Sequence, residues 1–275
     1  MKIAADYFEE GLGISLSFLV GALVLGTALP HLLKGVSINL FWKTVFVFTS
    51  SLSVLGGTIL LLFVPDGPFR KPSQCLNFSA FYKVFKKPVF RSATFGYFGH
   101  MWELYAFWAF APVMLKIYTQ THDMHTLNIS LWSFIIIACG GLGCVLGGYL
   151  SKKLGVKKIA FICLFLSCSC CMISPMLFKV ESSILFLAFL IFWGMVVIAD
   201  SPLFSTLVAR NASSEIKGTA LTIVNCIGFA ITIVSIQLMT VLRNLTDSNS
   251  IFAILALGPI LGLIALNVKN KPNSI

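Results

Sequence analysis

The sequence predicts an all-α fold, a polytopic membrane helix bundle with about eight transmembrane helices. Of its residues, 57% are hydrophobic and 11% are charged, whereas a soluble domain has about 25% charged residues. The charged residues cluster between long apolar runs, and most of these runs reach the ~20 residues that cross ~30 Å of hydrocarbon. A soluble protein of this composition would have too little polar surface to face water.

Each apolar run is expected to form one helix. The strict alternation that membrane β-strands need is absent from the runs, and a backbone in lipid must satisfy its hydrogen bonds internally. In chain order the runs are Gly11–Leu33, Trp42–Val64, Ala93–Ile117, Ile129–Tyr149, Ile159–Phe178, Ile184–Ala209, Thr219–Val241 and Ile251–Val268.

The long loop after the second run divides the chain into three parts. Residues 1–64 hold two expected helices, residues 65–92 are a basic linker, and residues 93–275 hold a six-helix unit. Prolines and charges interrupt the linker, which is expected to lie in the cytoplasm with a short surface helix at Phe78–Phe85.

The basic residues predict the orientation in the membrane. With eight spans, fifteen of the 20 lysines and arginines fall on the side that holds both termini, which predicts that both termini are cytoplasmic. The remaining five fall on the opposite side and are Lys34, Lys43, Lys116, Lys179 and Arg243.

Composition and motifs also argue against several function classes. The net charge of +10 comes from interhelical loops and not from one polar face, so nucleic acid is not an expected partner. A Gly-x(4)-Gly-Lys-Ser/Thr nucleotide loop is absent, and no catalytic cluster stands in a cytoplasmic loop, so an enzyme is not expected. The run Cys168-Ser169-Cys170-Cys171 does not have metal-site spacing and is expected to pack. No cofactor and no metal are therefore expected.

Ionisable residues inside the apolar runs are the best candidates for a functional site, because a charge at the bilayer centre costs ~2.5–3.5 kcal/mol on insertion scales. Glu103 and His100 share one face of the third run, and they either exchange a proton during transport or form a buried structural pair. Asp200, two residues before Pro202, either binds substrate or protons or caps a broken helix. Tyr105 is the aromatic residue expected to face a cavity.

Two polar residues of the seventh run complete the candidate set. Asn225 and Gln237 either bind substrate or join neighbouring helices by hydrogen bonds.

A glycine-bounded basic loop follows the fourth run and carries a family resemblance. Its segment includes Gly148, Lys152, Lys153, Gly155 and Lys157, and it resembles the loop between the second and third helices of each half of the major facilitator superfamily. The glycines permit a tight turn, and the lysines hold the loop in the cytoplasm. Lys152 stands where that family usually has an acid, so a gating salt bridge is not expected there.

Further segments resemble a bacterial subgroup of the same superfamily. They are Gly96-Tyr97-Phe98-Gly99-His100-Met101-Trp102-Glu103-Leu104-Tyr105, Ala199-Asp200-Ser201 and Gly218-Thr219-Ala220-Leu221-Thr222. The resemblance implies a secondary transporter in the bacterial inner (plasma) membrane, which carries a small molecule or ion by alternating access between two six-helix halves.

The same resemblance implies a partial major-facilitator fold. Gly21, Gly26 and Pro30 make the first run similar to that family's fifth helix, so the first four transmembrane helices are expected to be missing. A separate polypeptide with those helices, or a second copy of the chain, is then an expected partner. The alternative is a vestigial or structural membrane protein without transport activity.

Overall fold

The structure is a computed structural model, and it describes residues 2–8, 11–36, 41–69, 82, 84–123, 127–212 and 216–267. All regular elements within these residues are helices, which confirms the predicted all-α class. Most of the expected surface helix Phe78–Phe85 lies outside the described residues. The helices are α1 (Lys2–Tyr7), α2 (Leu12–Val36), α3 (Trp42–Phe63), α5 (Pro88–Thr121), α6 (Ile129–Leu154), α7 (Val156–Leu177), α8 (Ser183–Ala199), α9 (Ser201–Asn211), α10 (Lys217–Leu245), η1 (Asn249–Ala256) and α11 (Leu257–Asn267).

Seven stretches of the described chain are long and apolar enough to cross a membrane, and they match seven of the eight predicted runs. The helices α8 and α9 form one such stretch, and η1 and α11 form another. The remaining run, Ala93–Ile117, lies within α5, which has 34 residues but is not among the seven. Its interior carries His100 and Glu103 together with several aromatic residues, and these lower its mean hydropathy.

The helix α2 packs closely on α6. Gly21 and Gly141 meet at the crossing, where a Cβ on Gly21 would lie 3.2 Å from the Gly141 carbonyl oxygen. At the end of α2, the Asn128 side chain accepts a hydrogen bond from the Leu131 amide (3.0 Å) and donates one to the Gly35 carbonyl (2.9 Å). Asn128 therefore caps α6 and ties it to α2 at the same time.

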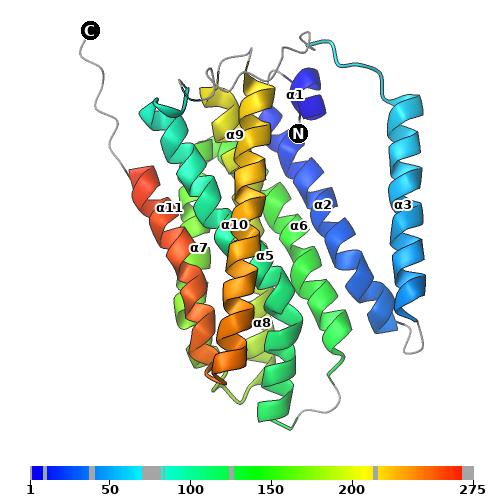
Figure 1. The fold of residues 1–275 in the computed structure, drawn as a ribbon, viewed down its shortest axis with the longest axis vertical. Coiled ribbons are helices and arrows are strands. Elements are labelled where there is room, and N and C mark those ends of the chain that lie inside the picture. The colour runs from blue at the N-terminus through cyan, green and yellow to red at the C-terminus, as the bar shows by residue number, and fades with distance from the viewer. Residues whose placement is uncertain are drawn as a thin grey trace.

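The helix α3 stands at the edge of the bundle (Figure 1). None of its residues is buried, and it contacts α2. Its large apolar side chains remain exposed, including Leu61 at 84%. Several of its hydroxyl groups donate to its own backbone, as Thr58 does to the Val54 carbonyl.

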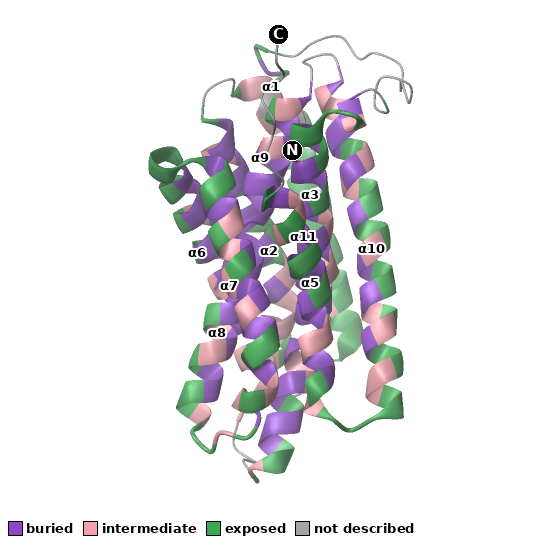
Figure 2. Ribbon diagram, turned by 90° about the vertical axis from the view of Figure 1, so that its left-hand side faces the viewer, coloured by how far each residue is buried: buried purple, intermediate pink, exposed green. Residues whose placement is uncertain are grey.

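The core of the bundle surrounds α5. This helix packs against α6, α8, α9, α10 and α11, and buried residues gather inside the bundle whereas exposed residues lie on its periphery (Figure 2). Large buried rings such as Phe107 and Trp193, whose centroids lie 4.6 Å apart, fill the centre. Because the neighbouring helices bury His100 and Glu103, these two ionisable residues of α5 are kept away from lipid.

Candidate functional site

A buried histidine–aspartate pair joins α5 to the break between α8 and α9. His100 Nδ1 lies 2.8 Å from Asp200 Oδ1, and both side chains are 0% exposed. The two atoms are at ion-pair distance. Within the described residues, His100 Nε2 and Asp200 Oδ2 have no hydrogen-bond partner. Such unsatisfied buried polar atoms are rare in proteins and suggest a functional role or an ordered water.

The helix break directs the Asp200 carboxylate toward α5. Asp200 ends α8 and precedes α9, whose first turn contains Pro202. Its carbonyl accepts a hydrogen bond from the Phe204 amide at 2.8 Å, but its side chain makes no capping bond to α9. The predicted capping alternative is therefore wrong for the side chain, because the carboxylate faces His100 instead.

Aromatic rings enclose His100. The Tyr97 and Phe204 ring centroids lie 6.0 and 6.2 Å from that of His100. Gly96 lets Phe204 come this close, since a Cβ on Gly96 would lie 2.4 Å from Phe204 Cε1. The pair consequently sits in an apolar enclosure, where an electrostatic interaction is stronger than in water.

Glu103 belongs to a second polar cluster. Its Oε1 accepts hydrogen bonds from Trp193 Nε1 (2.7 Å) and Cys171 Sγ (3.2 Å), and its Oε2 accepts one from Ser167 Oγ (2.9 Å). The side chain is 1% exposed. Three donors from α7 and α8 thus satisfy a carboxyl group in the middle of the bundle.

The structure separates the two residues that the sequence places on one helical face. His100 is directed to Asp200, and Glu103 is directed to α7 and α8, so each has its own partners. The three donors to Glu103 were not among the sequence candidates. Cys171 was expected to pack as an apolar residue, and the structure adds a hydrogen bond to that role. The signal for this cluster was the spacing of Ser167 and Cys171, which places both on one face of α7.

The remaining candidates lie around α10. Tyr105 of α5 is half-buried, and its ring centroid lies 5.2 Å from that of Trp108 and 5.5 Å from that of Phe229 on α10. Asn225 is half-buried and interacts with another group, whereas Gln237 is exposed. Tyr105 therefore packs in an aromatic group between α5 and α10, and the exposed side chain of Gln237 is not enclosed by the bundle.

The glycine-bounded loop between α6 and α7 is a tight turn, as predicted. Gly155 has a φ of 90°, a conformation that favours glycine, and it both ends α6 and begins α7. Gly148 allows α6 to approach α2, because a Cβ there would lie 2.4 Å from Ser17 Oγ. Lys152 and Lys153 are exposed.

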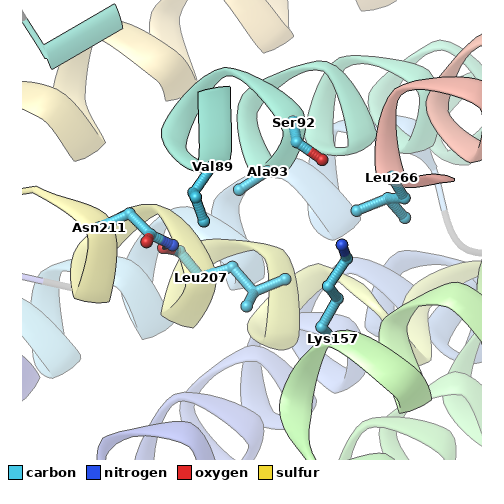
Figure 3. A pocket seen from close by; sticks show the side chains of 7 residues that line it. All are labelled: Val89, Ser92, Ala93, Lys157, Leu207, Asn211 and Leu266. Atoms are coloured by element: carbon cyan, nitrogen blue, oxygen red, sulfur yellow. Dashed lines mark hydrogen bonds between the residues drawn. The ribbon is translucent and has the colours of Figure 1, made fainter. Parts of the chain in front are cut away.

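Lys157 also belongs to the glycine-bounded loop, and it borders a small pocket. Figure 3 shows its amine directed between α5, α9 and α11, toward Ser92 and Leu266. The pocket has a volume of about 20 Å³, which is room for about one water molecule. Nearby, the Ser92 hydroxyl donates to the Ala265 carbonyl at 2.7 Å, so this end of the bundle is joined by polar contacts.

An all-helical bundle with membrane-spanning helices, a broken helix and buried ionisable residues defines an integral membrane protein of the transporter class. A family model described as Major Facilitator Superfamily matches residues 1–236, and the chain belongs to that family of transporters, which are not enzymes. No curated protein matches the chain.

Proposed function

We propose that the chain acts in secondary active transport of a small solute by alternating access, with protons carried by His100, Asp200 and Glu103. The observation that carries this proposal is the His100–Asp200 pair, which is fully buried and incompletely hydrogen-bonded at a helix break. Intramembrane ionisable residues of this kind mark ion and proton pathways, and broken helices often line transporter binding sites.

The two polar clusters suit two parts of a proton cycle. The His100–Asp200 pair has unsatisfied atoms that can gain or lose a proton when the α8–α9 break opens to water. The Glu103 carboxyl is held by three donors, so its exchange with water requires α5 to move relative to α7 and α8. We infer that such a movement couples proton binding to the alternation of the bundle.

The proposed orientation places both termini in the cytoplasm of a bacterial cell, in its inner membrane. Figure 1 supports a common side, because α1, the start of α5 and the end of α11 lie toward one end of the bundle. The junction of α6 and α7, with Lys152, Lys153 and Lys157, lies at that end as well. A basic end of this kind is typical of the cytoplasmic face.

We also propose that further membrane helices complete the solute pathway. The support is the exposure of α3, none of whose residues is buried, and of the face of α10 that includes Phe229 and Ile233. A separate polypeptide or a second copy of the chain would supply the second wall. Without such a partner, we expect the purified chain to show no transport.

The alternative function is structural, and complete burial of the polar clusters favours it. Glu103 is 1% exposed with every carboxylate oxygen bonded, as a residue that joins helices would be. A vestigial or structural membrane protein would keep these contacts without moving solute. The Glu103 cluster therefore distinguishes the two functions through its response to substitution.

The test uses the protein reconstituted in liposomes with its partner helices, or alone, and a panel of small organic anions, cations and neutral solutes under a proton gradient. The proposal expects solute-dependent proton flux in the completed assembly and its loss in Asp200→Asn, His100→Gln and Glu103→Gln. Asp247→Asn is the matched control, because this exposed acid lies at the end of the bundle. Normal proton-coupled uptake in all three variants would overturn the proposed roles and leave these residues as structural contacts.

A further inference from the structure

An apolar groove runs between α10 and α11 over the first half of α5. It has a volume of about 590 Å³, within the range of ~300–1,000 Å³ that is typical of ligand sites. Figure 1 shows α10 and α11 on either side of this part of α5. The groove is lined by Phe95, Phe98, Gly99, Trp102, Ile231, Val234, Leu257, Gly258 and Leu261.

The groove lies at the depth of lipid tails. Trp102 is near the midpoint of α5, Ile231 is near the midpoint of α10, and Gly258 is near the midpoint of the stretch from Asn249 to Asn267. All three midpoints correspond to the centre of the hydrocarbon layer when the helices span a membrane. The groove therefore faces hydrocarbon and not water.

The groove is open toward the bilayer and is closed on the side of the bundle core. Val234 and Leu261 on its rim are 59% and 66% exposed, so a molecule in the bilayer can enter from the side. Gly99 and Gly258 form the floor where α5 and α11 touch, since a Cβ on Gly99 would lie 2.3 Å from the Gly258 carbonyl oxygen. These two glycines let α5 and α11 come into backbone contact, and this contact closes the floor of the groove.

We propose that this groove retains one acyl chain of a membrane phospholipid. The hydrophobic effect does not hold a lipid tail against a protein that lies within lipid, so retention depends on van der Waals contact. A concave apolar surface touches a chain on several sides, and an empty groove would forfeit those contacts. Lipid tails are the apolar chains present at this depth, so an acyl chain is the expected occupant. This inference does not depend on the proposed transport function.

Native mass spectrometry of the intact chain, titrated in detergent with phosphatidylcholine or with phosphatidylglycerol, tests the proposal. We expect one tightly held lipid for either headgroup, because the groove contacts the chain and not the head. Val234→Trp and Leu261→Trp fill the groove from exposed positions and should weaken that first adduct about tenfold, equivalent to ~1.4 kcal/mol. Ile233→Trp and Ile264→Trp are matched controls on the same two helices, 63% and 60% exposed, and should leave the adduct unchanged.

A second measurement locates the chain. In micelles with phosphatidylcholine whose acyl chains carry bromine near their middle, Trp102 fluorescence should be quenched at about one lipid per protein. The Trp102 contribution is the difference between the wild type and Trp102→Phe. Equal weakening by the groove variants and the control variants, or quenching that grows without saturation, would overturn the proposal. Co-purification of a lipophilic compound other than a phospholipid, displaced by the groove variants, would also overturn it.

Discussion

His100 of α5 and Asp200 at the α8–α9 break face each other at 2.8 Å with no exposure to solvent. The pair connects the central helix of the bundle to a place where the backbone helix is interrupted. The Phe204 amide of α9 donates to the Asp200 backbone carbonyl and not to its carboxylate. The carboxylate instead contacts His100 of α5. A movement of the break would therefore change the environment of both ionisable groups together.

The first prediction concerns the energy of this pair. His100→Ala and Asp200→Ala each leave a buried polar partner uncompensated, and each should destabilise the protein by about 3–5 kcal/mol. The double variant should cost less than the sum, with a coupling of roughly 0.5–3 kcal/mol. Unfolding in mixed micelles with increasing SDS measures all four proteins.

In a control cycle, Ser92→Ala takes the place of His100→Ala and is combined with Asp200→Ala. Ser92 lies two helical turns before His100 and is bonded to the Ala265 carbonyl, so its effect should add to that of Asp200→Ala. Additivity of His100→Ala and Asp200→Ala themselves would contradict the interaction.

The second prediction concerns Glu103. Glutamine retains an oxygen for the Trp193 and Cys171 donors, and the Ser167 hydroxyl can rotate to accept from the new amide. Glu103→Gln should therefore fold with a loss of roughly 1 kcal/mol or less, whereas Glu103→Leu should lose about 1–3 kcal/mol because the Trp193 N–H remains unpaired.

The same SDS titration measures both Glu103 variants. Adding Trp193→Phe to Glu103→Leu should recover part of the loss, since the unpaired Trp193 N–H is then removed. If glutamine and leucine destabilise the protein equally, the hydrogen bonds of Glu103 have no measurable weight.

The third prediction concerns helix contact through glycine. A Cβ on Gly143 would lie 2.4 Å from the Met195 carbonyl oxygen, which is backbone and cannot move aside without shifting α8. Gly143→Ala should therefore destabilise the bundle by about 1–3 kcal/mol through overpacking. Gly26→Ala is the matched control, because nothing lies within 4 Å of its Cβ position and alanine favours a helix by roughly 0.5–1 kcal/mol.

Thermal unfolding in one detergent compares the two alanine variants. The expected result is a lower midpoint for Gly143→Ala and an equal or higher midpoint for Gly26→Ala. A reversed order would mean that α6 and α8 do not cross as the structure describes.

The fourth prediction concerns orientation. In a variant without native cysteines, Lys179→Cys and Lys153→Cys introduce exposed thiols at opposite ends of the bundle. The basic asymmetry predicts that a membrane-impermeant maleimide labels Lys179→Cys in intact cells and labels Lys153→Cys after the cells are opened. Labelling of Lys153→Cys from outside intact cells would reverse the orientation.

Helical class and membrane character could be predicted from the sequence because both depend on local properties. Seven apolar runs have the length and hydropathy of spans, and the basic turn at Gly155 follows from glycine and lysine chemistry. The third run, Ala93–Ile117, shows the limit of this reasoning. The helix α5 forms as expected, but its His100 and Glu103 make it too polar for the same criterion, and its surroundings of apolar helices compensate for that polarity.

By itself, the sequence determined that this protein is a bundle of membrane helices with ionisable residues at His100, Glu103 and Asp200. Tertiary structure alone decided the partners of those residues. Positions three apart on a helix differ by about 60° around its axis, which is enough to reach different neighbours. His100 consequently meets Asp200, whereas Glu103 meets Ser167, Cys171 and Trp193. Helical spacing places a side chain on a face, but the packing of distant helices decides what that face contacts.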